Sequence, residues 1–108
     1  MAYYLLQVAY TADAWTAQLK NPQNRIEAVR PMVERLGGRI DSVYYAFGEY
    51  DLVGIFQMPD NVSAAAFSLA ASAGGAVKAI KTTPLMTLDE GIQAMKKAPA
   101  AGYRPPAS

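Results

Sequence analysis

The sequence predicts an α+β fold, and three observations support this prediction. Four runs rich in β-branched, aromatic or other apolar residues occur along the chain, at 3–10, 39–47, 52–58 and 76–83. Segments with helical spacing or high alanine content separate them or follow them. The runs at 39–47 and 52–58 are joined by a short segment with one glycine and two carboxylates, Gly48 to Asp51. This arrangement is typical of a β-hairpin with its turn near the glycine.

The first strand, expected over Tyr3 to Tyr10, contains only one plainly polar residue, Gln7. A strand that is apolar on both sides is usually covered on both sides. We therefore expect it to lie at the centre of the sheet.

Two helical segments are expected between the first and second strands. One covers 11–19 and has Thr11 or Asp13 as its N-cap. The second begins at Asn21-Pro22, since asparagine caps helices and proline suits the first helical position. Its apolar residues recur at three- and four-residue spacing, which predicts one stripe facing the core: Ile26, Val29, Val33 and Leu36.

Two residues in this second helix have a predictable effect on its backbone. Pro31 removes one helical N–H and crowds the carbonyl of Glu27, so a kink or local break is expected near it. Gly37 follows the last periodic residue, and we expect it to end the helix in a left-handed conformation.

Strict alternation along the second strand, Arg39 to Phe47, would place Ile40, Ser42, Tyr44 and Ala46 on one face. The third strand, Leu52 to Met58, carries large apolar groups on both faces. An alanine-rich helix is expected over 62–73, and a fourth strand over 76–83 that Pro84 ends.

A last helix is expected to begin at Thr87, because threonine followed three residues later by Glu90 forms a capping box. Lys96 and Lys97 then suit its C-terminal end. We expect one domain over 1–98, followed by a flexible Pro- and Ala-rich tail over 99–108.

The order β-α-β-β-α-β, with a C-terminal helix, predicts a ferredoxin-like fold: a four-stranded antiparallel sheet with helices on one face. The other face would carry apolar side chains in water, and isolated proteins rarely expose a large patch of this kind. We therefore expect a second copy, or a bound partner, to cover it; two such sheets packed face to face would make a dimeric α/β barrel.

The composition narrows the possible chemistry. The chain has 108 residues, a net charge of +1, and neither cysteine nor histidine. Disulfides, thiolate sites, histidine bases and histidine-ligated metals or haem are therefore excluded. Basic and acidic residues are mixed, so we expect no nucleic-acid partner. The start of the chain lacks a charged region followed by a long apolar run, so we expect a cytoplasmic protein without a membrane partner.

The segment Gly48-Glu49-Tyr50-Asp51 resembles the signature of the GYD-domain family, in which Gly, Tyr and Asp recur at this spacing. The resemblance extends over roughly residues 3–95. Its other matches are Asn21 to Ala28, Leu36-Gly37-Gly38, and the helix start at 87–90. It implies the dimeric α/β-barrel, ferredoxin-like fold and almost nothing about activity. Pro31 and the tail depart from the family pattern.

Several side chains are candidates for a functional site. Glu49 and Asp51 have the types and spacing of an acid–base pair or a cation site, although an aspartate in a turn often only binds backbone N–H groups. Arg25 begins a helix, where its charge is disfavoured, so we expect Glu49 or Asp51 to pair with it. A structural salt bridge is the simpler alternative to a ligand anchor.

Aromatic residues and lysines complete the candidate set. Tyr10, Trp15, Tyr44, Tyr45 and Phe47 would suit a pocket for a small apolar ligand, or an aromatic core or dimer interface. Lys81, with Lys78, either binds a substrate anion or protects a strand edge. The predicted pocket comprises Tyr10, Trp15, Arg25, Tyr44, Glu49, Asp51 and Lys81.

The sequence thus predicts a homo-oligomeric α/β-barrel protein that needs no cofactor and binds a small molecule or a protein partner. The alternative is a cofactor-independent enzyme of the dimeric α/β-barrel type, monooxygenase- or isomerase-like, with its pocket between the long helix and the sheet. A third hypothesis is a scaffold role in which the tail makes the contact.

Overall fold

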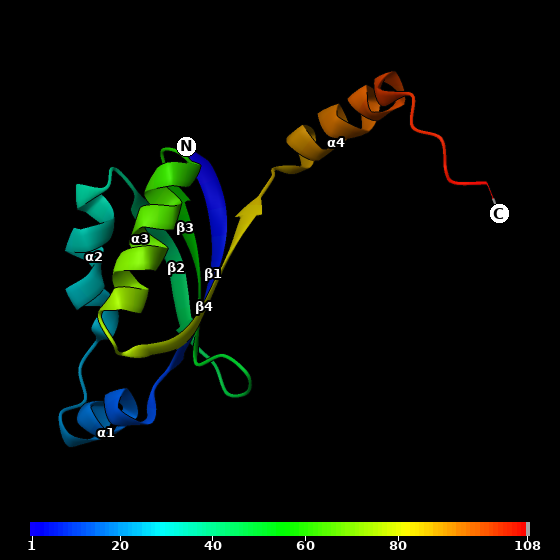
Figure 1. The fold of residues 1–108 in the computed structure, drawn as a ribbon. Helices are drawn as coiled ribbons and strands as arrows, with labels where there is room; N and C mark the ends of the chain where they lie inside the picture. The colour runs from blue at the N-terminus through cyan, green and yellow to red at the C-terminus, as the bar shows by residue number, and fades with distance from the viewer. Residues whose placement is uncertain (108) are drawn as a thin grey trace.

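The computed structural model describes residues 1–107 as one antiparallel sheet with two helices against one face (Figure 1). Its strands follow the order β2-β3-β1-β4. This confirms the predicted α+β, ferredoxin-like fold and the central place of the first strand. In chain order the elements are β1 (Ala2–Tyr10), α1 (Ala12–Lys20), α2 (Arg25–Arg35), β2 (Arg39–Tyr45), β3 (Leu52–Met58), α3 (Asn61–Ala73), β4 (Val77–Leu85) and α4 (Leu88–Lys97), then a 3-10 turn at Ala98–Ala101.

The start of α2 differs from the prediction. Asn21 ends α1, and the side chain of Asn24 caps α2 by accepting a hydrogen bond from the N–H of Ile26 at 3.0 Å. α2 also continues through Pro31 without a break. Pro31 and Glu27 both lie on the exposed side of the helix, so water can reach the carbonyl that lost its partner.

The alternation predicted for β2 is wrong because the strand contains a bulge. The pairing with β3 shifts between Ile40 and Ser42, so Ile40 and Val43 face the helices together. Asp41, at the shift, accepts a hydrogen bond at 2.8 Å from Nε2 of Gln57 on β3. That bond gives the buried Gln57 side chain a partner.

Two strand ends also differ from the prediction. β2 ends at Tyr45, and Phe47 lies fully exposed in the following loop. β4 does not end at Pro84 but continues through it to Leu85, with Pro84 opposite Tyr4 of β1. β4 is an edge strand, and proline fits an edge because one side of its backbone has no partner.

The core lies between the sheet and helices α2 and α3. Alternate residues of β1, among them Tyr4, Leu6 and Val8, point into it and are buried. Val33 of α2 is fully buried there, and Phe67 of α3 packs on Phe56 with ring centroids 5.8 Å apart. The predicted stripe of α2 is confirmed, since its other three members pack against the same cluster.

The opposite face of the sheet carries a second apolar surface, here called the open face. Leu5 lies beside Ile55 of β3 and Thr83 of β4, and these side chains stay partly exposed. Within residues 1–107 no helix lies against this face (Figure 1). The sheet therefore carries large apolar side chains on both faces, as the sequence predicted, and the open face also includes the polar Gln7 and Gln57. The further apolar members of the open face are Tyr3, Val53 and Leu85.

α4 begins with the predicted capping box, in which Thr87 and Glu90 bind each other's backbone N–H groups at 3.1 and 2.9 Å. The helix projects away from the rest of the molecule, and the tail continues outward from it (Figure 1). Ser108, the last residue of the predicted tail, lies outside the described residues. No helix within 1–107 has the length and apolar character required to cross a bilayer.

Candidate functional site

Asp51 fastens the β2–β3 loop to the end of β1 and to α1. Its Oδ2 accepts hydrogen bonds from the backbone N–H of Tyr10 at 2.9 Å and from the indole N–H of Trp15 at 3.2 Å. Its own backbone N–H donates to the carbonyl of Val8 at 2.8 Å. This carboxylate therefore acts as an acceptor that holds three segments together, which is the structural role that the sequence left open.

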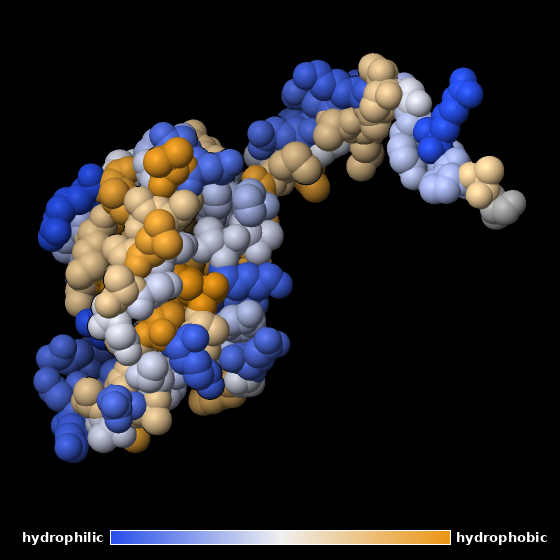
Figure 2. Space-filling model, in the orientation of Figure 1, coloured by the Kyte–Doolittle hydropathy of each residue, from blue (hydrophilic) through white to orange (hydrophobic). Residues whose placement is uncertain are grey.

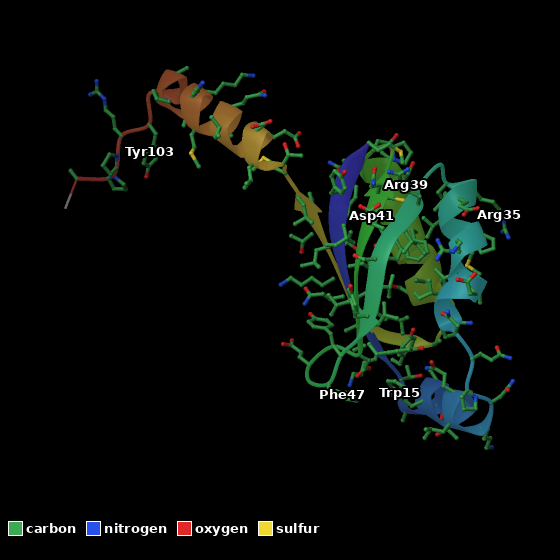
Figure 3. The ribbon with its side chains drawn as sticks, turned by 180° about the vertical axis from the view of Figure 1, so that it is seen from behind. Trp15, Arg35, Arg39, Asp41, Phe47 and Tyr103 are labelled. Atoms are coloured by element: carbon green, nitrogen blue, oxygen red, sulfur yellow. The ribbon has the colours of Figure 1, made fainter. Side chains whose placement is uncertain are left out.

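The loop that carries Asp51 is closed by a hydrogen bond from the N–H of Ala46 to the carbonyl of Asp51 at 2.8 Å. Gly48 adopts a φ of +147°, which side-chain-bearing residues rarely adopt, so glycine suits this position. Glu49 is exposed beside it. Phe47 and Trp15 lie at the same end of the sheet (Figure 3).

Tyr10 is the centre of a small polar and aromatic cluster. Its ring meets Trp15 edge to face, with centroids 5.5 Å apart and planes at 80°. Burial raises the pKa of the Tyr10 hydroxyl above its usual 10.0; Tyr45 and Asp51 act in the same direction, and the Arg25 guanidinium opposes them. Tyr10 is thus a neutral hydroxyl at pH 7, suited to donating a hydrogen bond rather than removing a proton.

Arg25 does not form the ion pair expected with Glu49 or Asp51. The two ion pairs found among residues 1–107 join Arg30 to Glu27 at 3.5 Å and Arg39 to Asp41 at 3.9 Å. Both are largely exposed, so each contributes little to stability. The accepting Oδ2 of Asp51 is already occupied by two N–H groups, and Arg25 acts on Tyr10 instead.

A groove of about 440 Å³ lies between the first half of α2 and β2. Its floor is apolar and consists of Ile26, Ile40, Val43 and Leu52, while polar and aromatic side chains surround it. This volume falls within the usual range for small-molecule sites. The surrounding residues are Asn24, Glu27, Arg30, Asp41, Ser42, Tyr44 and Tyr45.

The residues of the predicted pocket occupy three places. Tyr10, Trp15, Arg25 and Asp51 gather at the end of β1. Tyr44 lines the groove, and Glu49 is exposed at the loop tip.

Lys81 belongs to the opposite edge of the sheet. Tyr44 pairs with Val53, Val53 with Gln7, and Gln7 with Lys81. Tyr44 and Lys81 are therefore three strand spacings apart across the sheet, or about 14 Å. Lys81 therefore shares the open face with Tyr44 but not the groove.

Most residues that line the groove were not among those predicted. Its apolar floor consists of Ile26 from the α2 stripe, which was assigned to the core, Ile40 and Val43 from β2, and Leu52 from β3. The only available signal was the amphipathic pattern of α2 beside an edge strand.

Among the described residues, no group of three or more carboxylates is placed to hold a metal ion.

The family model of the GYD domain matches residues 4–95. The chain belongs to the GYD-domain family. No curated protein and no solved structure matches it. Within this GYD domain the signature residues Gly48 and Asp51 have the two structural roles described above: one allows the turn and the other fastens it.

Replacing Asp51 by alanine is expected to destabilise the GYD domain by about 2–4 kcal/mol, because two buried or half-buried N–H donors lose their acceptor. Asp51→Asn keeps one acceptor oxygen and is expected to lose less. Urea denaturation followed by the fluorescence of Trp15 measures both changes.

Glu49→Ala is the matched control, since it removes an exposed carboxylate from the same loop. We expect it to change stability by less than about 0.5 kcal/mol. An equal loss in the Glu49 and Asp51 variants would contradict the structural role of Asp51.

The raised pKa of Tyr10 predicts an alkaline loss of stability. Below pH 10 the hydroxyl is protonated in both the folded and the unfolded chain. As the pH rises past 10.0, the unfolded chain loses this proton first, so the free energy of unfolding falls. Tyr10→Phe should therefore show a shallower fall between pH 9 and 11 in urea denaturation, whereas Tyr103→Phe, in the exposed tail, should follow the wild type.

Proposed function

We propose that this GYD-domain protein is a homodimer, with its two sheets packed face to face, and that each copy binds a small molecule in the groove between α2 and β2. The observation that carries the proposal is the open face, an apolar surface that the chain's own helices leave uncovered.

The composition of the open face supports a second copy as its cover. Leu5 lies opposite Ile55 at its centre, Gln7 and Gln57 lie on the same face of these two strands, and charged residues lie near its edges, Arg39 on β2 and Lys81 on β4. An apolar centre with a polar rim is the usual layout of a protein–protein interface. In a two-fold dimer the same patch serves both copies, so one self-complementary surface is sufficient.

The groove supports binding of a small molecule that has an apolar body and a polar end. Ile26 and Val43 offer an apolar floor, and the Arg30–Glu27 pair offers hydrogen-bond donors and acceptors at the rim. Tyr45 of the groove pairs with Leu52, and Leu52 pairs with Val8, two residues before Tyr10. A bound molecule would therefore lie near the Tyr10 cluster.

Cofactor-independent catalysis is the second candidate function, and the neutral Tyr10 hydroxyl is the observation that favours it. A tyrosine kept protonated can donate a hydrogen bond or a proton to a developing oxyanion. The same observation argues against Tyr10 as a general base. The hydrogen bonds that Asp51 accepts from Tyr10 and Trp15 favour a structural carboxylate over a base.

The dimer is tested by Ile55→Glu, which places a charge at the centre of the open face of each copy. We expect the dissociation constant to rise by roughly 100-fold or more, because two carboxylates would be buried without partners. Sedimentation equilibrium across nanomolar to micromolar protein measures it, with circular dichroism to verify folding.

Val62→Glu is the control for this experiment: Val62 is 79% exposed on α3, on the other side of the molecule. It receives the same change and should leave association unaffected. A wild-type chain that stays monomeric throughout the concentration range would refute the proposed dimer.

The groove is tested with 2-naphthol, which has an aromatic body and one hydroxyl. We expect amide chemical shifts to change along α2 and β2 on titration, and Tyr45→Ala, which removes an aromatic wall, to weaken binding several-fold. Tyr103→Ala removes an exposed tyrosine outside the groove and should have no effect. Shifts confined to the open face would contradict a groove site.

A further inference from the structure

α4 is an amphipathic helix whose apolar side is covered by no other part of residues 1–107. Leu88 is 89% exposed, Met95 73% and Ile92 48%, and these three residues form one stripe at helical spacing. Figure 2 shows α4 with a hydrophobic side and a hydrophilic side. A helix of about ten residues is marginal in water on its own, so α4 requires a surface that buries the stripe.

The chain exposes more surface than a compact monomer of its size, and it is more extended. Its exposed area is 7739 Å², whereas a folded monomer of this mass exposes about 5,800 Å². Its radius of gyration is 17.5 Å, against about 13 Å for a compact domain of this length. The excess area of roughly 1,900 Å² per copy exceeds the 800 Å² or so that each partner buries in a standard interface.

The direction of α4 indicates which molecule supplies the missing surface. Only Met86 and Thr87 separate β4 from α4, and the helix extends on the side of the sheet opposite α2 and α3 (Figure 1). A second copy on the open face would occupy this same side. α4 of each copy would then lie beside the body of the other.

We propose that the two copies exchange their α4 helices, each packing Leu88, Ile92 and Met95 against its partner's body. This inference rests on the proposed dimer and adds a second contact to it, outside the sheet faces. By two-fold symmetry each dimer contains two of these contacts. Each apolar side chain of the stripe therefore contributes twice to the free energy of dimerisation.

The charges of α4 favour a protein surface over a lipid surface. Asp89 and Glu90 in the first turn balance Lys96 and Lys97 in the last, so the helix has no net charge. Amphipathic helices that bind membranes usually carry a basic polar face, which attracts anionic lipids. α4 offers no such attraction.

The test combines hydrogen exchange with sedimentation equilibrium on the full chain. Amides of α4 should exchange rapidly at concentrations where the chain is monomeric, and slowly where it is dimeric. The change from rapid to slow exchange should follow the fraction of the chain that is dimeric. Ile92→Glu should raise the dissociation constant of the dimer by on the order of 100-fold.

Two further variants are the controls. Gln93→Glu introduces the same side chain on the polar side of α4 and should leave the dissociation constant unchanged, and Ile92→Leu should stay close to the wild type. A loss of dimer in Gln93→Glu as large as in Ile92→Glu would overturn the specific contact of the stripe.

The remaining outcomes separate this inference from the dimer itself. A dimer in which α4 still exchanges rapidly, or in which Ile92→Glu has no effect, would overturn the helix exchange while leaving the sheet-to-sheet dimer intact. Protection of α4 that is independent of concentration would mean that the helix folds onto its own chain, which also overturns the exchange. A monomer at every concentration would overturn both proposals.

Discussion

A sheet has two faces, and within residues 1–107 helices cover only one of them. α2 and α3 cover the side that carries Tyr4, Leu6 and Val8, and these residues form the core. On the other face of β1, Tyr3 and Leu5 are also apolar and remain partly exposed. The placement of the core, the proposed dimer and the position of α4 all depend on this imbalance between apolar strands and available helices.

The signature of the GYD family has a physical explanation in this structure. The β2–β3 loop must turn at a backbone angle that suits Gly48, and it must be fastened to the rest of the fold. Asp51 does this with three hydrogen bonds that reach β1 and α1, which are distant in sequence. The signature thus describes how a loop is held, and a function need not be inferred from its carboxylate.

The sequence predicts features that depend on neighbouring residues better than those that depend on distant ones. The capping box at Thr87 and the left-handed Gly37, with its φ of +84°, are local and are found as predicted. The central place of β1 follows from its composition. The amino-acid composition around Asp41 does not predict the bulge, because a bulge is defined only by how β2 pairs with β3.

The candidate site was harder to predict for the same reason. Asp51 and Trp15 were both identified from the sequence, but their hydrogen bond joins residues 36 positions apart. A pocket between the long helix and the sheet was named as one alternative, but the residues that line the groove depend on how α2 lies across an edge strand, which no local pattern reveals. The proline in β4 was interpreted as a strand end, but an edge strand tolerates proline, and β4 continues through it to Leu85.

The two edges of the sheet limit how these molecules can assemble. β2 has a bulge that disrupts the regular spacing of its backbone groups, and β4 carries a proline that lacks a donor, together with outward lysines. Each feature discourages another strand from extending the sheet. Open-ended fibres built by strand addition are therefore disfavoured, even though the chain exposes much apolar surface. These edges are consistent with the proposed face-to-face dimer, which needs no added strand.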